Sequence, residues 1–156
     1  MARPETPTLT PLASNRKALH DYEVLERLEG GLQLAGTEVK SARQGRVQLK
    51  DSHVEFRDGQ AFLVGVHISP YSHGNRENQE PERPRRVLLH RREIDRLYGQ
   101  VQQKGLSVVP LAVYAKGPWI KVELGLVRGK KQYDKRQAEK EKTLDREMRQ
   151  AMSERR

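Results

Sequence analysis

Two runs of alternating apolar and polar residues flank an Asp-Gly pair, and this feature constrains the fold more than any other. The runs are residues 53–57 and 60–64, with Asp58-Gly59 between them. A period of two places every second side chain on one face of a strand. Asp-Gly favours the tight turn of a hairpin, because both turn positions need a positive φ. The sequence therefore predicts an antiparallel β-hairpin over 53–64.

A second pair of strand-like runs lies at 107–115 and 119–127, joined by residues 116–118. Every second residue from Ile120 to Leu126 is apolar, which predicts one buried face for the later strand. Pro110 lacks the backbone N–H that a sheet ladder needs, so its strand is expected at a sheet edge or bulged there. The opposite face of the later strand carries Trp119, Lys121 and Glu123.

An earlier strand is expected at 21–28. Its alternation is interrupted by Glu26, which a β-bulge would explain. The chain is expected to turn at Gly30-Gly31 into a short strand. The polar stretch 67–86 contains three prolines and is expected to be a long exposed loop.

Two helices are predicted. Ile94, Leu97, Tyr98 and Val101 follow helical spacing, and Gly105 marks the expected end of this helix. A shorter helix is expected to begin at Thr37, whose hydroxyl can cap it, and to end near Gln44.

Many short strands with few helices predict a mainly β fold. We expect a small closed antiparallel β-barrel of the OB type, with two or three helices and a basic carboxy-terminal tail. A flattened sheet with helices on one face is the alternative. The expected divisions are a disordered segment at 1–14, an RNA-binding β-barrel domain at 15–128 and a tail at 129–156.

The positive charge is concentrated near the end of the chain. Lys and Arg number 30 against 21 Asp and Glu, a formal net charge of +9. Residues 128–156 hold 11 of the basic and six of the acidic residues. A basic tail usually binds a polyanion, most often nucleic acid, although a solvated helix of mixed charge is also possible. A thin apolar stripe predicts a tail that is mobile alone and helical on a partner; it comprises Leu144, Met148, Ala151 and Met152.

Several kinds of chemistry have no residues to carry them. The chain has no cysteine, and its five histidines are scattered without metal-ligand spacing. It lacks a phosphate-binding loop and a nucleophile elbow, so we expect a binding protein without catalysis, cofactor or metal. Eight aromatic residues are too few for an extended platform on which a single strand could stack, which favours recognition of a folded RNA.

The first 20 residues lack the apolar core of a signal peptide, and the apolar run 111–115 is far shorter than the roughly 20 residues of a membrane span. We expect a cytoplasmic monomer that contacts no membrane.

Blocks of residues in a fixed order carry a family resemblance. The two most specific are Gly-Thr-Glu-Val-Lys-Ser at 36–41 and the run 129–136, which contains Gly-Lys-Lys and Asp-Lys-Arg. Shorter matches in the same order are Asn15-Arg16-Lys17-Ala18, Asp21-Tyr22, Asp51-Ser52, Phe62-Leu63, His67-Ile68, 85–90 and Val109-Pro110-Leu111. Together these blocks resemble the SsrA-binding proteins, a family also called small protein B.

The resemblance implies binding to the tRNA-like domain of transfer-messenger RNA and delivery of that RNA to stalled ribosomes for trans-translation. Its partners would be transfer-messenger RNA (SsrA RNA) and the ribosome, chiefly the small-subunit decoding centre and messenger channel. The implied RNA-binding residues are Asn15, Arg16, Lys17, Glu29, Glu38, Lys40, Ser41, Arg43, Leu88 and Lys121. The implied ribosome-binding residues of the tail are Gly129, Lys130, Lys131, Tyr133, Asp134, Lys135 and Arg136.

Simpler interpretations accompany these assignments. Glu29 and Glu38 could be ordinary surface carboxylates, and Leu88 a core residue. Tyr133 stands where many family members carry histidine, so a base-stacking ring is kept but an imidazole is not. For the whole chain, the alternative is a ribosome-associated structural RNA-binding protein with a basic extension; a hydrolase is a remote third possibility.

Overall fold

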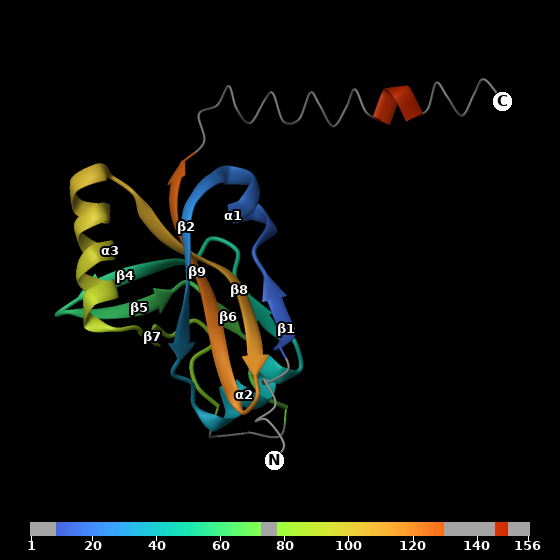
Figure 1. The fold of residues 1–156 in the computed structure, drawn as a ribbon. Coiled ribbons are helices and arrows are strands. Elements are labelled where there is room, and N and C mark those ends of the chain that lie inside the picture. The colour runs from blue at the N-terminus through green and yellow to red at the C-terminus, as the bar shows by residue number, and fades with distance from the viewer. Residues whose placement is uncertain (1–8, 73–77, 130–145, 150–156) are drawn as a thin grey trace, which may run out of the picture.

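The computed structural model describes residues 9–72, 78–129 and 146–149. Within this part of the chain, one helical turn lies at 146–149, and the other elements form the body shown in Figure 1. In chain order they are β1 (Leu9–Ser14), α1 (Arg16–Asp21), β2 (Tyr22–Leu32), α2 (Gly36–Arg43), β3 (Val47–Gln48), β4 (His53–Arg57), β5 (Gln60–Val64), β6 (His67–Ile68), β7 (Arg85–Leu88), α3 (Arg91–Lys104), β8 (Ser107–Lys116) and β9 (Trp119–Gly129).

The main sheet is antiparallel, seven-stranded and open. Its strand order is β1-β8-β9-β2-β7-β5-β4, and β3 pairs separately with β6. The prediction of a closed barrel is therefore wrong, because the edge strands β1 and β4 do not pair with each other. Instead the sheet folds over, so that β4 packs across β8 without a ladder between them. Figure 1 shows the long strands β2, β8 and β9 side by side, with β4 and β5 crossing behind them.

Both predicted hairpins are confirmed. β4 pairs with β5 over the whole of 53–64, and both turn residues have positive φ, 50° at Asp58 and 73° at Gly59. β8 pairs with β9, and its register shifts between Pro110 and Ala112. Pro110 thus lies at a bulge. β8 is not an edge strand along its later half, because β1 pairs with it from Ala112 to Lys116.

Strand β2 confirms one expectation and overturns another. Its pairing with β9 shifts between Val24 and Glu26, which is the predicted bulge. No turn forms at Gly30-Gly31, because the strand continues to Leu32 and pairs there with β7. A Cβ on Gly30 would lie 2.7 Å from Cγ1 of Val87. Glycine at this position therefore permits close packing of two strands.

Both predicted helices are present at the expected positions, but the start of one of them differs from the prediction. α3 ends at Gly105, whose φ of 62° is the left-handed conformation expected of a helix-ending glycine. α2 begins at Gly36, and its N-cap is Ala35. The prediction that Thr37 caps this helix is wrong, because Thr37 already lies in the first turn.

Three segments differ from the sequence-based expectation of irregular chain. Leu9–Ser14 forms β1 against β8, so the segment predicted as disordered contains a strand, while residues 1–8 lie outside the described residues. The expected long loop carries β6 at its start and β7 at its end. α1 was not predicted; its buried Ala18 packs on Val109 and Val127.

The main hydrophobic core lies between the two halves of the folded sheet and α3. Its fully buried members include Leu63, Val87, Leu97, Val122 and Leu124. Ile120, Val122, Leu124 and Leu126 of β9 face this core, as the alternation predicted. Trp119, Lys121 and Glu123 are on the other face, where Val127 further along the strand is buried against Ala18. Among the described residues, no helix has the length and apolar character needed to cross a membrane.

Candidate nucleic-acid interface

A groove of about 820 Å³ opens on the outward face of the sheet, where β2 and β7 end and β9 begins. Three residues predicted to bind RNA meet here from three strands: Glu29, Leu88 and Lys121. The strand register brings them together, because Gly31 lies opposite both Leu88 and Lys121. The groove is thus assembled by β-pairing between segments far apart in the sequence.

Two apolar side chains stand exposed in this groove. Leu88 is 50% exposed and Trp119 is 66% exposed. The interpretation of Leu88 as a core residue is therefore wrong. Trp119 was not among the predicted site residues, although its place in the alternation, two residues before Lys121 on the same strand face, was a usable signal. Together they offer a surface on which a base or a ribose can pack.

The Glu29 carboxylate is fixed in place rather than freely solvated. It accepts a hydrogen bond from the Tyr114 hydroxyl, and Nζ of Lys116 lies 3.4 Å from Oε1. The Tyr114 hydrogen bond, together with the charges of Lys116 and Lys121, lowers the pKa of Glu29 against the opposing effect of partial burial. Partial burial, and then the same hydrogen bond, raise the pKa of Tyr114, so the hydroxyl remains a donor. The groove therefore holds an ionised carboxylate beside lysine side chains.

Helix α2, whose Val39 lines the groove, carries two predicted cations. Arg43 donates from Nη2 to the carbonyl of Gly117 at 3.3 Å, next to the groove-lining Pro118. Lys40 is exposed, and its Nζ lies 5.5 Å from the centre of the Tyr71 ring. Both side chains can contact phosphates near the groove.

The other predicted cations lie at the opposite end of β2, on α1 (Figure 1). Arg16 is exposed, and Nζ of Lys17 lies 2.5 Å from a carboxylate oxygen of Asp51. The sequence-based set therefore divides into two groups, one at the groove and one at α1. An RNA that contacts both groups must extend along the length of β2.

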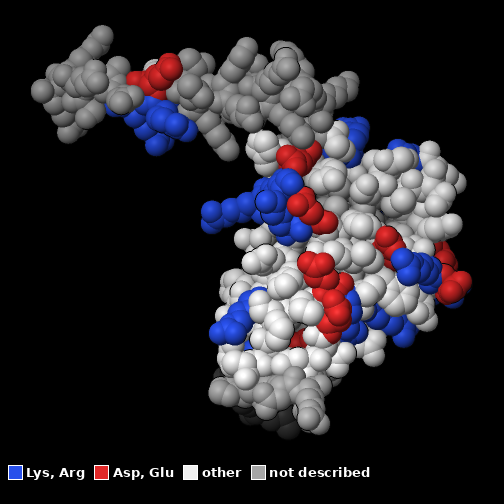
Figure 2. Space-filling view, turned by 180° about the vertical axis from the view of Figure 1, so that it is seen from behind, with Lys and Arg blue, Asp and Glu red and all other residues white. Residues whose placement is uncertain are grey.

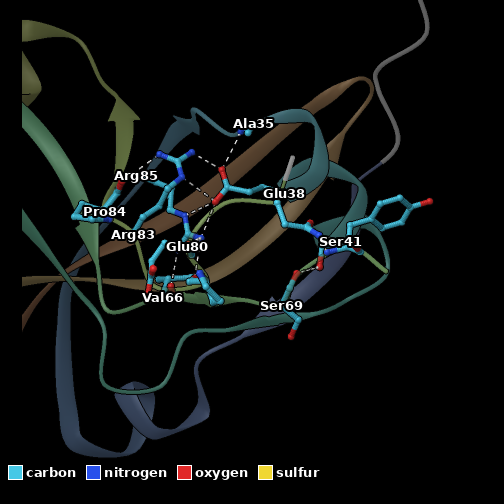
Figure 3. A network of polar contacts seen from close by, with 12 residues as sticks. Ala35, Glu38, Ser41, Val66, Ser69, Glu80, Arg83, Pro84 and Arg85 are labelled. Atoms are coloured by element: carbon cyan, nitrogen blue, oxygen red, sulfur yellow. Dashed lines mark hydrogen bonds and ion pairs between the residues drawn. The ribbon is translucent and has the colours of Figure 1, made fainter. Parts of the chain in front are cut away.

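Glu38 is buried in an ion-pair network with Arg83 and Arg85 (Figure 3). Its side chain is 4% exposed, and it accepts hydrogen bonds from the Ala35 N–H at 2.9 Å, Nε of Arg83 at 3.2 Å and Nε of Arg85 at 2.8 Å. Arg85 is 1% exposed and also donates to the carbonyls of Val66 and Pro81. Burial alone would raise the pKa of Glu38, but these hydrogen bonds outweigh it and lower the pKa.

The assignments of Glu38 and Ser41 as direct RNA contacts are therefore corrected, and so is the alternative that Glu38 is a surface carboxylate. Ser41 is fully buried, and its Oγ donates to the carbonyl of Ser69 at 2.5 Å. Both side chains anchor α2 to the segment that precedes β7. They hold the helix that carries Lys40 and Arg43.

Asn15 is likewise a buried structural residue. Its Oδ1 accepts from the Ala18 N–H at 3.1 Å and caps α1, while Nδ2 donates to the carbonyls of Leu49 at 3.2 Å and Pro110 at 2.9 Å. The side chain uses its acceptor and both N–H donors within the protein. Its assignment as a direct RNA contact is corrected on this ground.

Replacing Asn15 by alanine is expected to lower the free energy of unfolding by about 1–3 kcal/mol, because the helix loses its cap and two buried carbonyls lose their donor. Urea unfolding followed by circular dichroism measures this. Asn15→Asp keeps the cap acceptor but places a carboxylate against those two carbonyls, so it is expected to be destabilised as well. A folded Asn15→Ala protein of unchanged stability would contradict the structural role.

Charge on the body is mixed, not uniformly basic. On the face seen in Figure 2, Lys and Arg side chains are interspersed with Asp and Glu, and no single basic surface covers the described residues on that side. Gly129 ends β9 and is exposed. The other residues implied for the ribosome lie outside the described residues: Lys130, Lys131, Tyr133, Asp134, Lys135 and Arg136. Of the predicted apolar stripe, only Met148 is described, and it is exposed.

Comparison with known proteins gives consistent matches along most of the chain. The family model described as SmpB protein matches residues 12–154. An SsrA-binding protein from Carboxydothermus hydrogenoformans is 52% identical over 141 residues, which cover 90% of this chain and 95% of that protein. One from Geobacter metallireducens is 52% identical over 144 residues, covering 92% and 94%.

A solved structure agrees with these sequence matches. It is described as "tmRNA-SmpB: a journey to the center of the bacterial ribosome", and one of its chains is 48% identical to this protein. The TM-score is 0.66, and the match covers 79% of this chain and 87% of the other. The chain therefore belongs to the SmpB family of SsrA-binding proteins.

Proposed function

We propose that this protein binds the tRNA-like domain of transfer-messenger RNA and delivers that RNA to stalled ribosomes for trans-translation. The observation that carries the proposal is the groove, because Glu29, Leu88 and Lys121 meet there in a chain that belongs to this family. The solved relative, whose description names tmRNA, SmpB and the bacterial ribosome, supports both partners.

The residues of the groove suit a folded RNA with unpaired bases. Lys121, Lys40 and Arg43 contact phosphates, and Leu88 packs on a base or a ribose. Arg16 and Lys17 extend the phosphate contacts to the other end of β2. Asn15, Glu38 and Ser41 act indirectly, by holding α1 and α2 in place.

The tail has a separate task in this proposal. Residues 129–136 bind the ribosome at the small-subunit decoding centre, and the residues after them enter the vacant messenger channel and become helical there. The protein acts in the cytoplasm as a monomer, without a cofactor and without catalysing a reaction.

An electrophoretic shift assay tests the RNA specificity. At one fixed salt concentration, the protein is expected to bind the tRNA-like domain at least tenfold more tightly than a tRNA or an RNA duplex of matched length. Equal affinity for the three RNAs would contradict the proposal. Stoichiometric co-purification with ribosomes from unstressed cells would instead favour a structural ribosomal protein.

A further inference from the structure

Glu29 has unused hydrogen-bonding capacity directed at the groove. An ionised carboxylate offers about four acceptor positions on its two oxygens. The Tyr114 hydroxyl takes one position on Oε2, and the Lys116 ammonium approaches Oε1 at 3.4 Å. Each oxygen therefore keeps room for a further donor. The other carboxylate that lines the groove, Glu93, already accepts from the His90 N–H at 3.0 Å.

The surroundings of Glu29 suit an unpaired base more than a phosphate or a duplex. Trp119 and Leu88 line the same groove and are exposed, so they can cover the face of a base. A negative carboxylate repels phosphate but accepts from base N–H groups. Lys116 and Lys121, beside the carboxylate, can bind the phosphates of the same nucleotide or its neighbour.

Among the four RNA bases, only guanine presents two kinds of N–H donor side by side on its Watson–Crick edge, N1–H and the 2-amino group. Adenine and cytosine present one amino group there, and uracil presents one imino N–H. A carboxylate with one free acceptor position on each oxygen matches guanine in a bidentate arrangement.

We propose that the groove is a subsite for one unpaired guanine, whose Watson–Crick edge is read by Glu29 while Trp119 and Leu88 cover its face. Tyr114 and Lys116 are positioning residues in this subsite, because they hold the carboxylate in a fixed orientation. The inference rests on the proposed function only for the identity of the RNA that supplies the guanine.

Inosine substitution tests the base reading, because inosine lacks the 2-amino group of guanine. Each unpaired guanine of the tRNA-like domain is replaced singly by inosine, and affinity for the full-length protein is measured. At one position, inosine is expected to weaken binding about tenfold. The same substitution is expected to have no effect on the Glu29→Gln variant.

Glu123→Gln is the matched control. Glu123 lies opposite Glu29 in the β2–β9 pair, where it accepts from Nη1 of Arg27 at 2.6 Å and does not line the groove. This variant makes the same change of charge and is expected to keep the tenfold discrimination. The inference is overturned if wild-type protein binds every inosine RNA equally, or if Glu29→Gln still discriminates. A penalty seen only with 2′-deoxyguanosine overturns it too, because the carboxylate would then read the ribose.

A second measurement does not depend on the tRNA-like domain. Trp119 is the sole tryptophan of the chain, so intrinsic fluorescence reports this groove directly. RNA hairpins with one guanine in a uridine loop are expected to quench it at several-fold lower concentration than hairpins with inosine, adenine or cytosine there. Equal quenching by all four overturns the guanine subsite. A protein that discriminates here but does not prefer the tRNA-like domain would contradict the proposed function alone.

Discussion

Replacement of Glu38 by alanine is expected to lower the free energy of unfolding by about 3–5 kcal/mol, because it leaves the buried Arg85 guanidinium without its counter-charge. The loss includes the hydrogen bonds from Arg83 and from the Ala35 N–H. The denaturant midpoint in urea, followed by circular dichroism and by Trp119 fluorescence, measures it. A change below 1 kcal/mol would contradict the structural role assigned to this network.

Two comparisons separate the charge of Glu38 from its shape. Replacing both partners with apolar residues, Glu38→Leu with Arg85→Met, is expected to lower the free energy of unfolding less than Glu38→Ala does, because Arg85 is then no longer buried as a charge without its partner.

The pH dependence of stability gives the second comparison. Because the pKa of Glu38 is lowered in the folded protein, its contribution is full above the ordinary value of 4.5 and is lost as pH falls through the lower folded pKa. The stability difference between wild type and Glu38→Gln is therefore expected to shrink in acid.

The groove and the tail are expected to fail in different ways. Changing Glu29, Leu88 and Lys121 together to alanine should weaken binding of transfer-messenger RNA by roughly 100-fold or more, and tagging on stalled ribosomes should fall with it. These side chains are exposed or half-buried, so the variant is expected to stay folded. Filter binding measures the RNA affinity, and a reconstituted translation reaction measures tagging.

Truncation after Gly129 tests the tail in the way that the triple variant tests the groove. It removes the tail but keeps all of β9, including the ion pair between Arg128 and Glu23. The truncated protein should bind the RNA within about threefold of wild type, yet tagging should fall to background, because the ribosome contacts are lost. If truncation weakened RNA binding as severely as the groove variant does, the assignment of separate tasks to groove and tail would be wrong.

The parts of the fold that sequence predicted are those whose stabilising contacts are local. The Asp58-Gly59 turn and the alternation beside it contain enough information for the 53–64 hairpin. α1 lacks such a signal, because it has only six residues and its cap depends on Asn15 reaching the carbonyls of Leu49 and Pro110. The prediction of a closed barrel is wrong for a related reason: alternation predicts strands but not whether the two edge strands meet, so it could not decide between a barrel and the alternative of a flattened sheet.

The candidate site also has a part that local sequence patterns predict and a part that depends on long-range contacts. Alternation placed Lys121 and Trp119 on one face of a strand, but only the resemblance to a family selected Glu29 and Leu88. The sequence shows that residue 38 is a glutamate. It does not show that Arg83 and Arg85, more than 40 residues later, bind this carboxylate in the interior of the protein. Residues that hold an element and residues that contact a ligand look alike in sequence, and burial distinguishes them.

Strand β9 joins the groove to the tail without an intervening loop. Lys121 lies near its start and Gly129 at its end, and the pairing of β9 with both β2 and β8 keeps the strand extended. Eight steps of about 3.3 Å separate the two residues by roughly 26 Å. The strand therefore fixes the distance and the direction between an RNA bound in the groove and the first residue of the tail. Inserting or deleting a residue pair in β9 would change that spacing while leaving both end surfaces chemically unaltered.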